Sequence, residues 1–328
     1  MRKTTTVHRD ASLYRERQLG MALLVVLWVV ALMVLLVLVF SNTVQVSVRT
    51  ATYRKEAAQA HSLAWGGVQA AVLEIAYPPS EGQKPSPLWA WQHGQRAGVV
   101  PFQDGQAELQ VVNESGKVDL NFASQTQLLR LFAACDLAPA RAERMAQALV
   151  DWRTLPPADA QNGPPPGGGE HAPFESVEEV TNVPGISRDV FFGRADVDAR
   201  GGVRTEFGAA RDLTVRSKMA QININYASEA ALESVPGITG SFAQAIVRAR
   251  SQEPFKTVVE IGDRTGESVP DEALSFLTTA ESNTYTIVST GVIKDSPVRR
   301  TVEAVIQLAP LGALRYRIVA WYDDYWNQ

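Results

Sequence analysis

Histidine and cysteine, the side chains most often used as bases, nucleophiles and metal ligands, are few and scattered in this sequence. The histidines are His8, His61, His93 and His171, and no two of them fall in an H-x-x-x-H or H-E-x-x-H spacing. The single cysteine, Cys135, allows no intramolecular disulfide and no thiolate-rich metal site. The sequence also contains no G-x-S-x-G, P-loop or dinucleotide-binding motif. We therefore expect no enzymatic activity.

Two V-P-G-I turns, at residues 183–186 and 235–238, are the other candidates for chemistry. A tight turn of this kind between helices resembles the helix-hairpin-helix motif, whose backbone N–H groups hold a phosphate at a helix N-terminus. The motif needs a second glycine two positions after the first, but Ser187 and Thr239 stand there. Residues 110–280 carry 16 Lys and Arg against 23 Asp and Glu, which would repel a polyanion. We therefore expect these hairpins to be packing units.

A seven-residue motif occurs twice, as V-D-L-N-F-A-S at residues 118–124 and as I-N-I-N-Y-A-S at residues 222–228. Each final serine fits a helix N-cap, so helices are expected to begin at Gln125 and Glu229. The V-P-G-I turns and other shared pieces follow the two motifs in a different order. We interpret the two segments as related helical modules and not as tandem copies.

The composition is that of an ordinary folded protein. The 328 residues are 45% hydrophobic and 20% charged, with a net charge of -4. This length is typical of about two domains. The composition excludes a wholly disordered chain and a protein with many membrane spans, and the negative charge argues against nucleic acid as the main partner.

Residues 21–40 form a run of 20 residues without a charge, glycine, proline, serine or asparagine. As a helix this run would span about 30 Å, the thickness of a bilayer core. Basic residues exceed acidic ones in the preceding segment, namely Arg2, Lys3, Arg9, Arg15 and Arg17 against Asp10 and Glu16. The positive-inside rule then places this end in the cytoplasm. A buried soluble helix or a cleavable secretory signal is the alternative, but the run is long for a signal and no A-x-A site follows it.

The helical pattern continues beyond this run. Apolar residues recur at helical spacing, namely Val44, Val48, Ala51, Ala58, Trp65, Val68, Val72 and Ile75. Pro78 and Pro79 end the pattern, and Gly66 with Gly67 is a place where the helix could bend. The sequence predicts one helix over residues 21–76, whose second half covers a folded domain.

Alternating apolar and polar residues predict strands near residues 105–111, 284–288, 299–308 and 313–321. We expect residues 117–120 to pair back on the first of these strands, and residues 78–103 to form an irregular connection. Such strands make a small antiparallel sheet, whose apolar face needs a cover. The amphipathic half of the long helix is the available cover, and the helical modules would then interrupt one domain.

The start of the chain resembles that of type IV pilin-like precursors. Its leader R-E-R-Q-L-G at residues 15–20 is followed directly by the apolar run. The resemblance implies that a prepilin peptidase cuts between Gly20 and Met21. Most pilins have glutamate at the fifth mature position, where this chain has Val25. The missing glutamate, the L-L-V-V-L-W string ending at Trp28, and the helical modules are similar to the K-type minor pseudopilin of the type II secretion system (general secretion pathway protein K).

This resemblance implies an α+β fold, in which a pilin-like long N-terminal helix packs on a small antiparallel sheet and a large all-α insertion holds helix-hairpin-helix-like modules. It divides the chain into five parts: a leader at 1–20 removed by the peptidase, a transmembrane helix half at 21–43, an amphipathic half with the first strands at 44–120, the insertion at 121–280, and the C-terminal strands at 281–328. Four residues mark the membrane anchor, namely Met21, Val25, Trp28 and Phe40.

The function implied is structural. The chain would cap the tip of the periplasmic pseudopilus and support its assembly for secretion of folded proteins. It would cross the bacterial inner membrane once, with its N-terminus cytoplasmic and its main domain periplasmic. The implied partners are the I- and J-type minor pseudopilins, the major pseudopilin, the prepilin peptidase and the inner-membrane secretion platform, with no nucleic acid. The alternative is a membrane-anchored helix-hairpin-helix DNA-binding protein of the competence type.

The resemblance also implies a calcium ion, because K-type proteins bind calcium beside the insertion. The acidic residues nearest that place here are Asp151, Asp159, Glu170 and Glu175. Hard cations need several such oxygen ligands together. We expect no other cofactor.

Overall fold

The computed structural model describes residues 8–77, 90–92, 95–154, 172–197, 203–309 and 315–323. The chain forms two compact units, residues 1–58 and residues 59–328. A single helix, α1 (His8–Ala76), contributes to both units. It ends at Ala76, two positions before Pro78, as the sequence predicts, but it begins at His8 and not at residue 21, because the helix continues through the polar segment before the apolar run.

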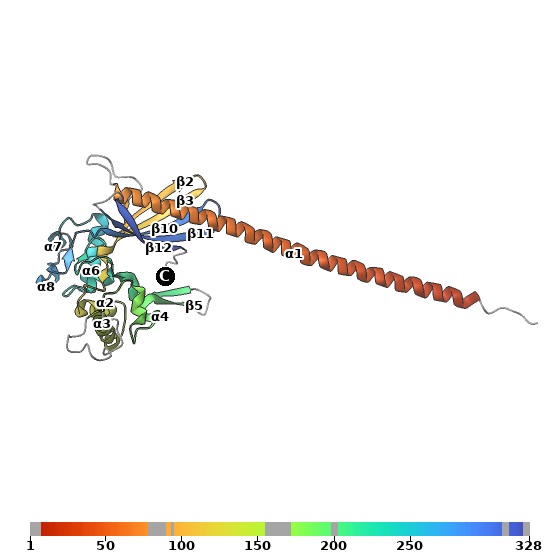
Figure 1. Ribbon diagram of the computed structural model, residues 1–328, viewed down its shortest axis with the longest axis horizontal. Helices are drawn as coiled ribbons and strands as arrows, with labels where there is room; N and C mark the ends of the chain where they lie inside the picture. Colours follow the sequence, from red (N-terminus) through yellow and green to blue (C-terminus); the bar gives the residue numbers. More distant parts are fainter. Residues whose placement is uncertain are drawn as a thin grey trace, which may run out of the picture. The chain divides into compact units, whose positions relative to one another are not determined.

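The second unit contains a six-stranded antiparallel sheet in the order β1-β2-β3-β10-β11-β12 (Figure 1). Its strands are β1 (Ala90–Gln92), β2 (Gln95–Phe102), β3 (Gly105–Asn113), β10 (Thr284–Ile293), β11 (Arg299–Leu308) and β12 (Tyr316–Asp323). Strand β3 pairs with β10 along its whole length, from Asn113 opposite Tyr285 to Gly105 opposite Ile293. The strands before and after the helical modules therefore belong to one sheet, which confirms that the modules are an insertion.

The last turns of α1 cover one face of this sheet. The buried helix residues are Ala60, Ala64, Gly67, Val68, Ala71, Val72, Ile75 and Ala76. The sheet contributes alternate residues of its three central strands to the same core, namely Leu109, Val111, Tyr285, Ile287, Val302, Ala304 and Ile306. At about 25 cal/mol per Å² of apolar surface removed from water, this core is the main force that holds the helix on the sheet.

The stripe predicted on this helix is only partly right. Val68, Val72 and Ile75 are buried, but Trp65 is 50% exposed and lies off the packed face. The buried face carries alanines at positions 60, 64 and 71 because the sheet backbone approaches closely, and an indole would not fit between them. The more N-terminal members of the stripe, such as Val44 and Val48, are exposed in the first unit.

Two predicted strand features are wrong. Residues 95–102 form strand β2, although the region 78–103 was expected to be irregular. Val118–Asp119 (β4) does not pair back on β3. It pairs in parallel with Leu213–Thr214 (β7), almost a hundred residues further along the chain. A two-residue strand gives too little alternation for its partner to be read from the sequence.

The insertion leaves the sheet through the short 3₁₀ helix η1 (Glu114–Gly116) and contains two modules. In module 1, β4 leads to α2 (Gln125–Ala134) and α3 (Pro139–Arg153), then to the 3₁₀ helix η3 (Glu178–Asn182) and α4 (Arg188–Phe192). A hairpin of β5 (Gly193–Val197) and β6 (Val203–Phe207) follows. The 3₁₀ helix η4 (Ala209–Asp212) and strand β7 then close the module beside β4.

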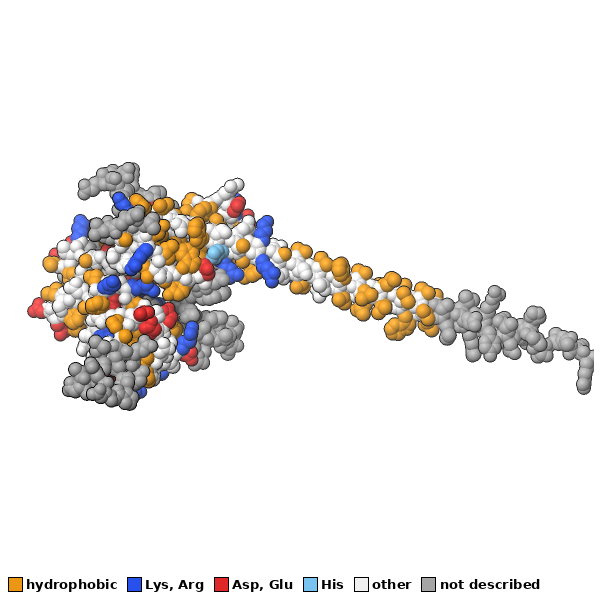
Figure 2. Space-filling view, in the orientation of Figure 1, with side chains coloured by type: hydrophobic (Ala, Val, Ile, Leu, Met, Phe, Trp, Pro, Cys, Tyr) orange, Lys and Arg blue, Asp and Glu red, His pale blue; other side chains and the backbone are white. Residues whose placement is uncertain are grey.

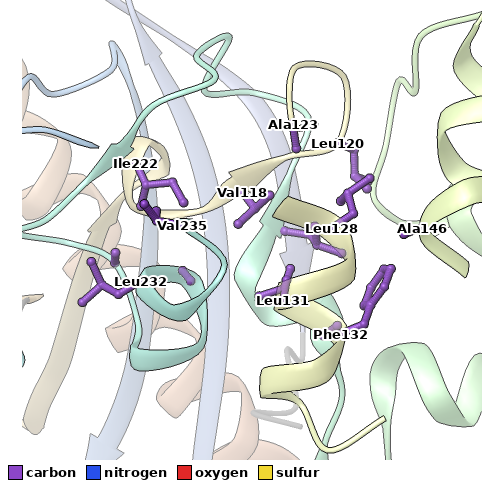
Figure 3. Close-up of a cluster of buried hydrophobic side chains, with 14 of the residues drawn as sticks. Val118, Leu120, Ala123, Leu128, Leu131, Phe132, Ala146, Ile222, Leu232 and Val235 are labelled. Atoms are coloured by element: carbon purple, nitrogen blue, oxygen red, sulfur yellow. The ribbon is translucent and has the colours of Figure 1, made fainter. Parts of the chain in front are cut away.

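Module 2 has the same plan. Strand β8 (Ile222–Asn223) leads to α5 (Glu229–Glu233) and α6 (Gly240–Gln252), then to α7 (Glu260–Thr265) and α8 (Asp271–Leu274). Strand β9 (Leu277–Thr278) pairs in parallel with β8 and closes the module. Figure 3 shows apolar side chains of both modules in one core, with Leu128, Leu131 and Phe132 from module 1 and Leu232 and Val235 from module 2.

Polar contacts repeat between the modules. The side chain of Asn121 makes two hydrogen bonds with the backbone of Phe174, and Asn225 makes the same two with Phe255. Ser124 and Ser228 cap α2 and α5, as the sequence predicts. The positive φ of Gly185, at 88°, matches that of Gly266, at 76°, since each lies between the third and fourth helix of its module.

The strands and helices that the two modules share follow in the same order, with the β5–β6 hairpin and η4 added in module 1, so the different order of the V-P-G-I strings does not mean a different order of elements. The V-P-G-I turn at residues 183–186 joins η3 to α4, whereas the turn at 235–238 joins α5 to α6. The module 1 partner of the second turn lies between α2 and α3. There Asp136 has a φ of 59° where Gly237 has 81°. Similar four-residue strings occupy different hairpins, so the sequence match was misleading.

Candidate functional site

The predicted membrane anchor is a helix with apolar side chains on every side. Among the described residues, the part of α1 from Leu23 onward holds an 18-residue window of mean hydropathy 3.4, none of which is buried. Val25 is 62%, Trp28 74% and Phe40 71% exposed. Figure 2 shows this apolar surface along the helix in orange. Exposing so much apolar surface to water would be unfavourable, so the segment fits a lipid environment.

The predicted processing site lies in the same helix. The backbone at Gly20 and Met21 is helical, and their side chains lie outside the described residues. After the apolar run, the hydroxyls of Thr43, Ser47 and Thr50 donate to backbone carbonyls four residues earlier, at 2.8–2.9 Å. These bonds satisfy the hydroxyls within the helix, so polar residues continue α1 directly from the apolar run.

Glycine permits the close approach of α1 to the sheet. A methyl group added at Gly67 would lie 2.6 Å from Ala107 Cβ and closer still to Ser289 Oγ. A methyl group at Gly291 of β10 would overlap the carbonyl oxygen of Ala60 and lie 2.8 Å from the backbone nitrogen of Ala64. The sequence suggested a bend at Gly66 and Gly67, but α1 is helical throughout and Gly67 serves packing instead.

A buried carboxylate joins the sheet to the insertion. Glu114 in η1 accepts hydrogen bonds from Lys117 Nζ at 2.7 Å, Thr286 Oγ1 of β10 at 2.6 Å and Thr214 Oγ1 of β7 at 2.5 Å. Burial alone would raise its pKa, but the charge of Lys117 and these hydrogen bonds outweigh burial and hold the pKa of Glu114 below its ordinary value of 4.5. This carboxylate therefore ties module 1 to both the turn and the sheet.

Two further carboxylates lie in the insertion near this junction. Burial raises the pKa of Asp119, which accepts from the backbone nitrogens of Asn121 and Lys218 at 2.9 Å. Burial also raises the pKa of Asp212, against the opposing effect of a hydrogen bond from Ser228 at the start of α5. Asp119 also accepts from Ser217 Oγ at 2.9 Å, so both carboxylates link segments that are distant in the chain.

The lone cysteine is poorly suited to nucleophilic chemistry. Burial, with the nearby charge of Asp212 as the next cause, raises the pKa of the Cys135 thiol to about 12. The reactive thiolate is therefore scarce at neutral pH. His61, on α1, is paired with Asp323 at the end of β12, Nε2 to Oδ1 2.9 Å.

The α5–α6 hairpin has the turn geometry of its motif but the wrong charges for a phosphate. A Cβ at Gly240, the first residue of α6, would lie 3.1 Å from Glu233 Oε1, and one at Gly237 would lie 2.7 Å from Glu272 Oε1. Two carboxylates thus flank the positions where a phosphate would approach. The basic residue nearby, Arg130, donates instead to the carbonyls of Glu233 at 3.0 Å and Ile238 at 2.6 Å. This hairpin is built to pack on α2.

The four residues predicted for calcium are not brought together in the part of the chain that the structure describes. Asp159 and Glu170 lie outside the described residues. Asp151 is exposed and accepts a hydrogen bond from Gln147 at 2.7 Å, and Glu175 is exposed beside η3. Among the described residues, no group of three His, Cys, Asp or Glu could hold a metal ion. Calcium binding therefore stays a prediction.

Sequence reasoning missed several residues that position these elements. Asn121 and Asn225 could have been found, because the repeated motif places an asparagine at the same position in both copies. Glu114 and Arg130 gave no signal, since Glu114 has Thr214 and Thr286 and Arg130 has Glu233 and Ile238 as partners a hundred or more residues away along the chain. The close approach at Gly291 was equally hidden, because nothing local distinguishes that glycine.

Comparison with known proteins gives three findings. The helix-hairpin-helix motif family matches residues 217–266, which span α5, α6 and α7 of module 2. No curated protein sequence matches the chain significantly.

The chain is also similar to a solved structure, described as the crystal structure of the GspK-GspI-GspJ complex from the enterotoxigenic Escherichia coli type 2 secretion system. The match has 16% sequence identity and a TM-score of 0.45, and it covers 85% of this chain and 98% of that chain.

Proposed function

We propose that this chain is a K-type minor pseudopilin that caps the tip of a periplasmic pseudopilus and supports its assembly for type II secretion. The apolar part of α1 anchors it in the inner membrane, with the leader in the cytoplasm and the second unit in the periplasm. It acts as a structural subunit and not as an enzyme. Its partners are the I- and J-type minor pseudopilins and the major pseudopilin, and the prepilin peptidase and the inner-membrane platform act on it during assembly.

One observation carries this proposal, namely a pilin-like unit interrupted by a two-module insertion. The C-terminal turns of α1 pack on a sheet in which β3 and β10 are neighbours, although the 170 residues between Asn113 and Thr284 separate them. The long apolar start of α1 and its packed end are the two properties that a filament subunit assembled from a membrane needs. Soluble helix-hairpin-helix proteins need neither.

The place where the insertion leaves the sheet supports a capping role. As α1 runs from Ala60 to Gly67, its neighbours on β10 change from Gly291 to Ser289, so later turns lie toward the start of β10. The insertion begins after Asn113 and ends before Thr284, at that same end of the sheet. The modules thus lie at the end of the sheet toward which α1 runs after leaving the membrane. In a filament that grows from the membrane, a bulky insertion there hinders addition of another subunit beyond it.

Val25 fits this role as well. A glutamate in lipid is unfavourable unless it is paired, and in pilin-like proteins the fifth mature residue is thought to pair with a neighbouring N-terminus. A tip subunit has no subunit above it whose N-terminus could pair with a glutamate at this position. Valine at this position therefore avoids placing an unpaired carboxylate in lipid.

Deletion of the gene tests the proposal. We expect secretion of folded substrates to be lost in the deletion strain and restored by the full chain. A Gly20→Ala variant should accumulate at the mass of the uncut precursor and restore secretion poorly. Normal secretion in the deletion strain would contradict the proposal.

A further inference from the structure

The helix segment after the apolar run of α1 carries basic side chains and no acidic ones. Its charged residues from position 41 to position 55 are Arg49, Arg54 and Lys55, and the first acidic residue is Glu56. All three basic side chains are exposed. Figure 2 shows blue side chains on both edges of the helix beyond its apolar stretch. This part of the first unit therefore presents a positively charged surface.

These three residues, which we call the basic girdle, surround the helix. At about 100° per residue, Arg54 and Lys55 lie about 140° and about 240° around the helix axis from Arg49. Residues that share one face of a helix are three or four positions apart, and no pair within the girdle has that spacing. A protein partner contacts one face of a helix, whereas lipid contacts a membrane helix from every side. The arrangement therefore fits a lipid surface better than a protein partner.

The residues between the apolar run and the girdle suit the interfacial layer of a bilayer. Residues 41–48 include no charge. Three valines in this stretch are 43–59% exposed, namely Val44, Val46 and Val48. The hydroxyls of Thr43 and Ser47 are satisfied by carbonyls of their own helix. Such a surface costs little beside lipid, so α1 stays close to the bilayer until the girdle begins.

The helix rise places Arg49 within reach of the headgroups. Its Cα lies about 13 Å beyond that of Phe40, at about 1.5 Å per residue. The headgroup layer takes up about 5–7 Å of this distance. Helical side chains tilt toward the N-terminus of the helix, so the long Arg49 side chain extends back toward this layer. Arg54 and Lys55 follow about one and a half turns later, where their charges still act on the layer within about a Debye length.

An aromatic residue accompanies the girdle. Tyr53 lies four positions after Arg49, on the same side of the helix, and is 52% exposed. Tyrosine is enriched where membrane helices meet water, because its ring is apolar and its hydroxyl is polar. Tyr53 therefore marks this level of α1 as an interface independently of the charges.

We propose that the basic girdle binds the anionic phospholipid headgroups of the leaflet in which the apolar run ends. The guanidinium of Arg49 donates to lipid phosphate, and Arg54 and Lys55 add attraction from just outside the headgroup layer. The contact sets the depth of α1 in the bilayer. This inference rests on the proposed function, because the orientation proposed there makes this leaflet the periplasmic one.

Photocrosslinking to lipid tests this contact. The full chain is reconstituted in vesicles of equal parts phosphatidylglycerol, which is anionic, and phosphatidylcholine, which has no net charge. One lipid at a time carries a photoreactive diazirine close to its glycerol, and mass spectrometry assigns the crosslinks to residues. Each basic residue near an anionic surface contributes roughly a fivefold preference, so residues 41–58 should react at least about fivefold more with the phosphatidylglycerol probe. At about 1 M salt this preference should fall below about twofold, since exposed charges are screened.

Two triple variants separate the girdle from net charge. The girdle variant combines Arg49→Gln, Arg54→Gln and Lys55→Gln, and its preference over residues 41–58 should fall below about twofold. The control variant changes three exposed basic residues of the second unit and should keep the parent preference, namely Arg144→Gln, Arg248→Gln and Lys256→Gln. All six side chains are exposed, so both variants should share the thermal unfolding midpoint of the parent. The leader keeps its own basic residues in every chain and is the internal reference for both probes.

The inference is overturned if residues 41–58 react equally with both probes, or if they react with neither. It is also overturned if the girdle variant keeps the preference or the control variant loses it. Each of these results leaves the proposed function standing as long as the deletion strain fails to secrete. Normal secretion in the deletion strain overturns the proposed function by a separate assay, because the lipid preference is measured without a secretion system.

Discussion

Gly66 and Gly67 are adjacent in α1, yet the structure predicts opposite effects when each becomes alanine. In helix interiors alanine is favoured over glycine by about 1 kcal/mol. At Gly66 the new methyl group meets Phe102 Cζ at 2.9 Å, and this partly exposed ring end can move. We therefore expect Gly66→Ala to be neutral or to raise the free energy of unfolding by up to about 1 kcal/mol.

At Gly67 the neighbours cannot move away. The methyl group would lie 2.6 Å from Ala107 Cβ and 3.0 Å from Leu109 Cδ2, both in the buried face of β3. Ordinary carbon contacts begin near ~3.5 Å, so helix and sheet must separate by about 1 Å. Overpacking of this kind costs about 1–3 kcal/mol, against a propensity gain of about 1 kcal/mol. We expect Gly67→Ala to be less stable than Gly66→Ala by about 2 kcal/mol.

The assay is urea unfolding of the two full-length variants in the same detergent, followed by tryptophan fluorescence. Both variants add one methyl group to the same helix turn, so detergent and helix propensity contribute equally and cancel in the comparison. A Gly67→Ala chain as stable as Gly66→Ala would refute the inferred close approach of α1 to β3. The account would also fail if Gly66→Ala were the less stable of the two.

Four further outcomes are expected. Glu114→Gln should lower the free energy of unfolding at pH 7 by about 2–3 kcal/mol, since it removes the buried charge that accepts from Lys117, Thr214 and Thr286. Folding lowers the pKa of Glu114, so the ionised carboxylate stabilises the folded chain fully above about pH 4.5, and this stabilisation is lost as pH falls through the lowered pKa. The free energy of unfolding of Glu114→Gln should therefore fall less on acidification than that of the parent chain. Asn225→Ala should cost about 2 kcal/mol in urea unfolding, because two hydrogen bonds to Phe255 are lost, and an unchanged midpoint would contradict this. The full chain in detergent should not retard duplex DNA at physiological salt, and salt-sensitive micromolar binding in a gel shift would favour the competence-type alternative. Calorimetry with calcium tests the calcium prediction: a saturating heat would support it, and no heat with the parent chain would remove it and leave the acidic residues as solvated loop carboxylates.

The parts of the fold that follow from local patterns were predictable. The prolines after Ala76 and the serines before α2 and α5 are local signals, and each marks a boundary that the structure confirms, whereas α1 begins at His8 and not at the start of the apolar run. The long strands β10 and β11 alternate clearly for the same reason. These features depend on residues within a few positions of one another, which is the range over which periodicity and capping act.

The parts that depend on distant partners were not predictable. Strand β4 is two residues long, and its pairing with β7 is fixed by tertiary packing. The helix face was misassigned at Trp65 because periodicity identifies apolar positions, while the close sheet selects small ones. The order of the modules was misread because the strings V-P-G-I are similar, although the first occupies the second hairpin of module 1 and the second occupies the first hairpin of module 2.

In the candidate site, too, some features follow from local sequence and others depend on distant partners. The anchor and the turn glycines could be named from the sequence, and the charge balance already argued against a phosphate ligand. The carboxylates of Glu233 and Glu272 beside the turn add the local reason, which required coordinates.

Co-purification from detergent-solubilised membranes tests the central claim most directly. The full, processed chain is isolated by an affinity tag, and the stoichiometry of the bound I- and J-type pseudopilins is measured by quantitative mass spectrometry. The account predicts a complex that contains all three proteins in equal numbers and persists at high salt. Recovery of the tagged chain alone, from membranes in which both partners are present, would contradict it.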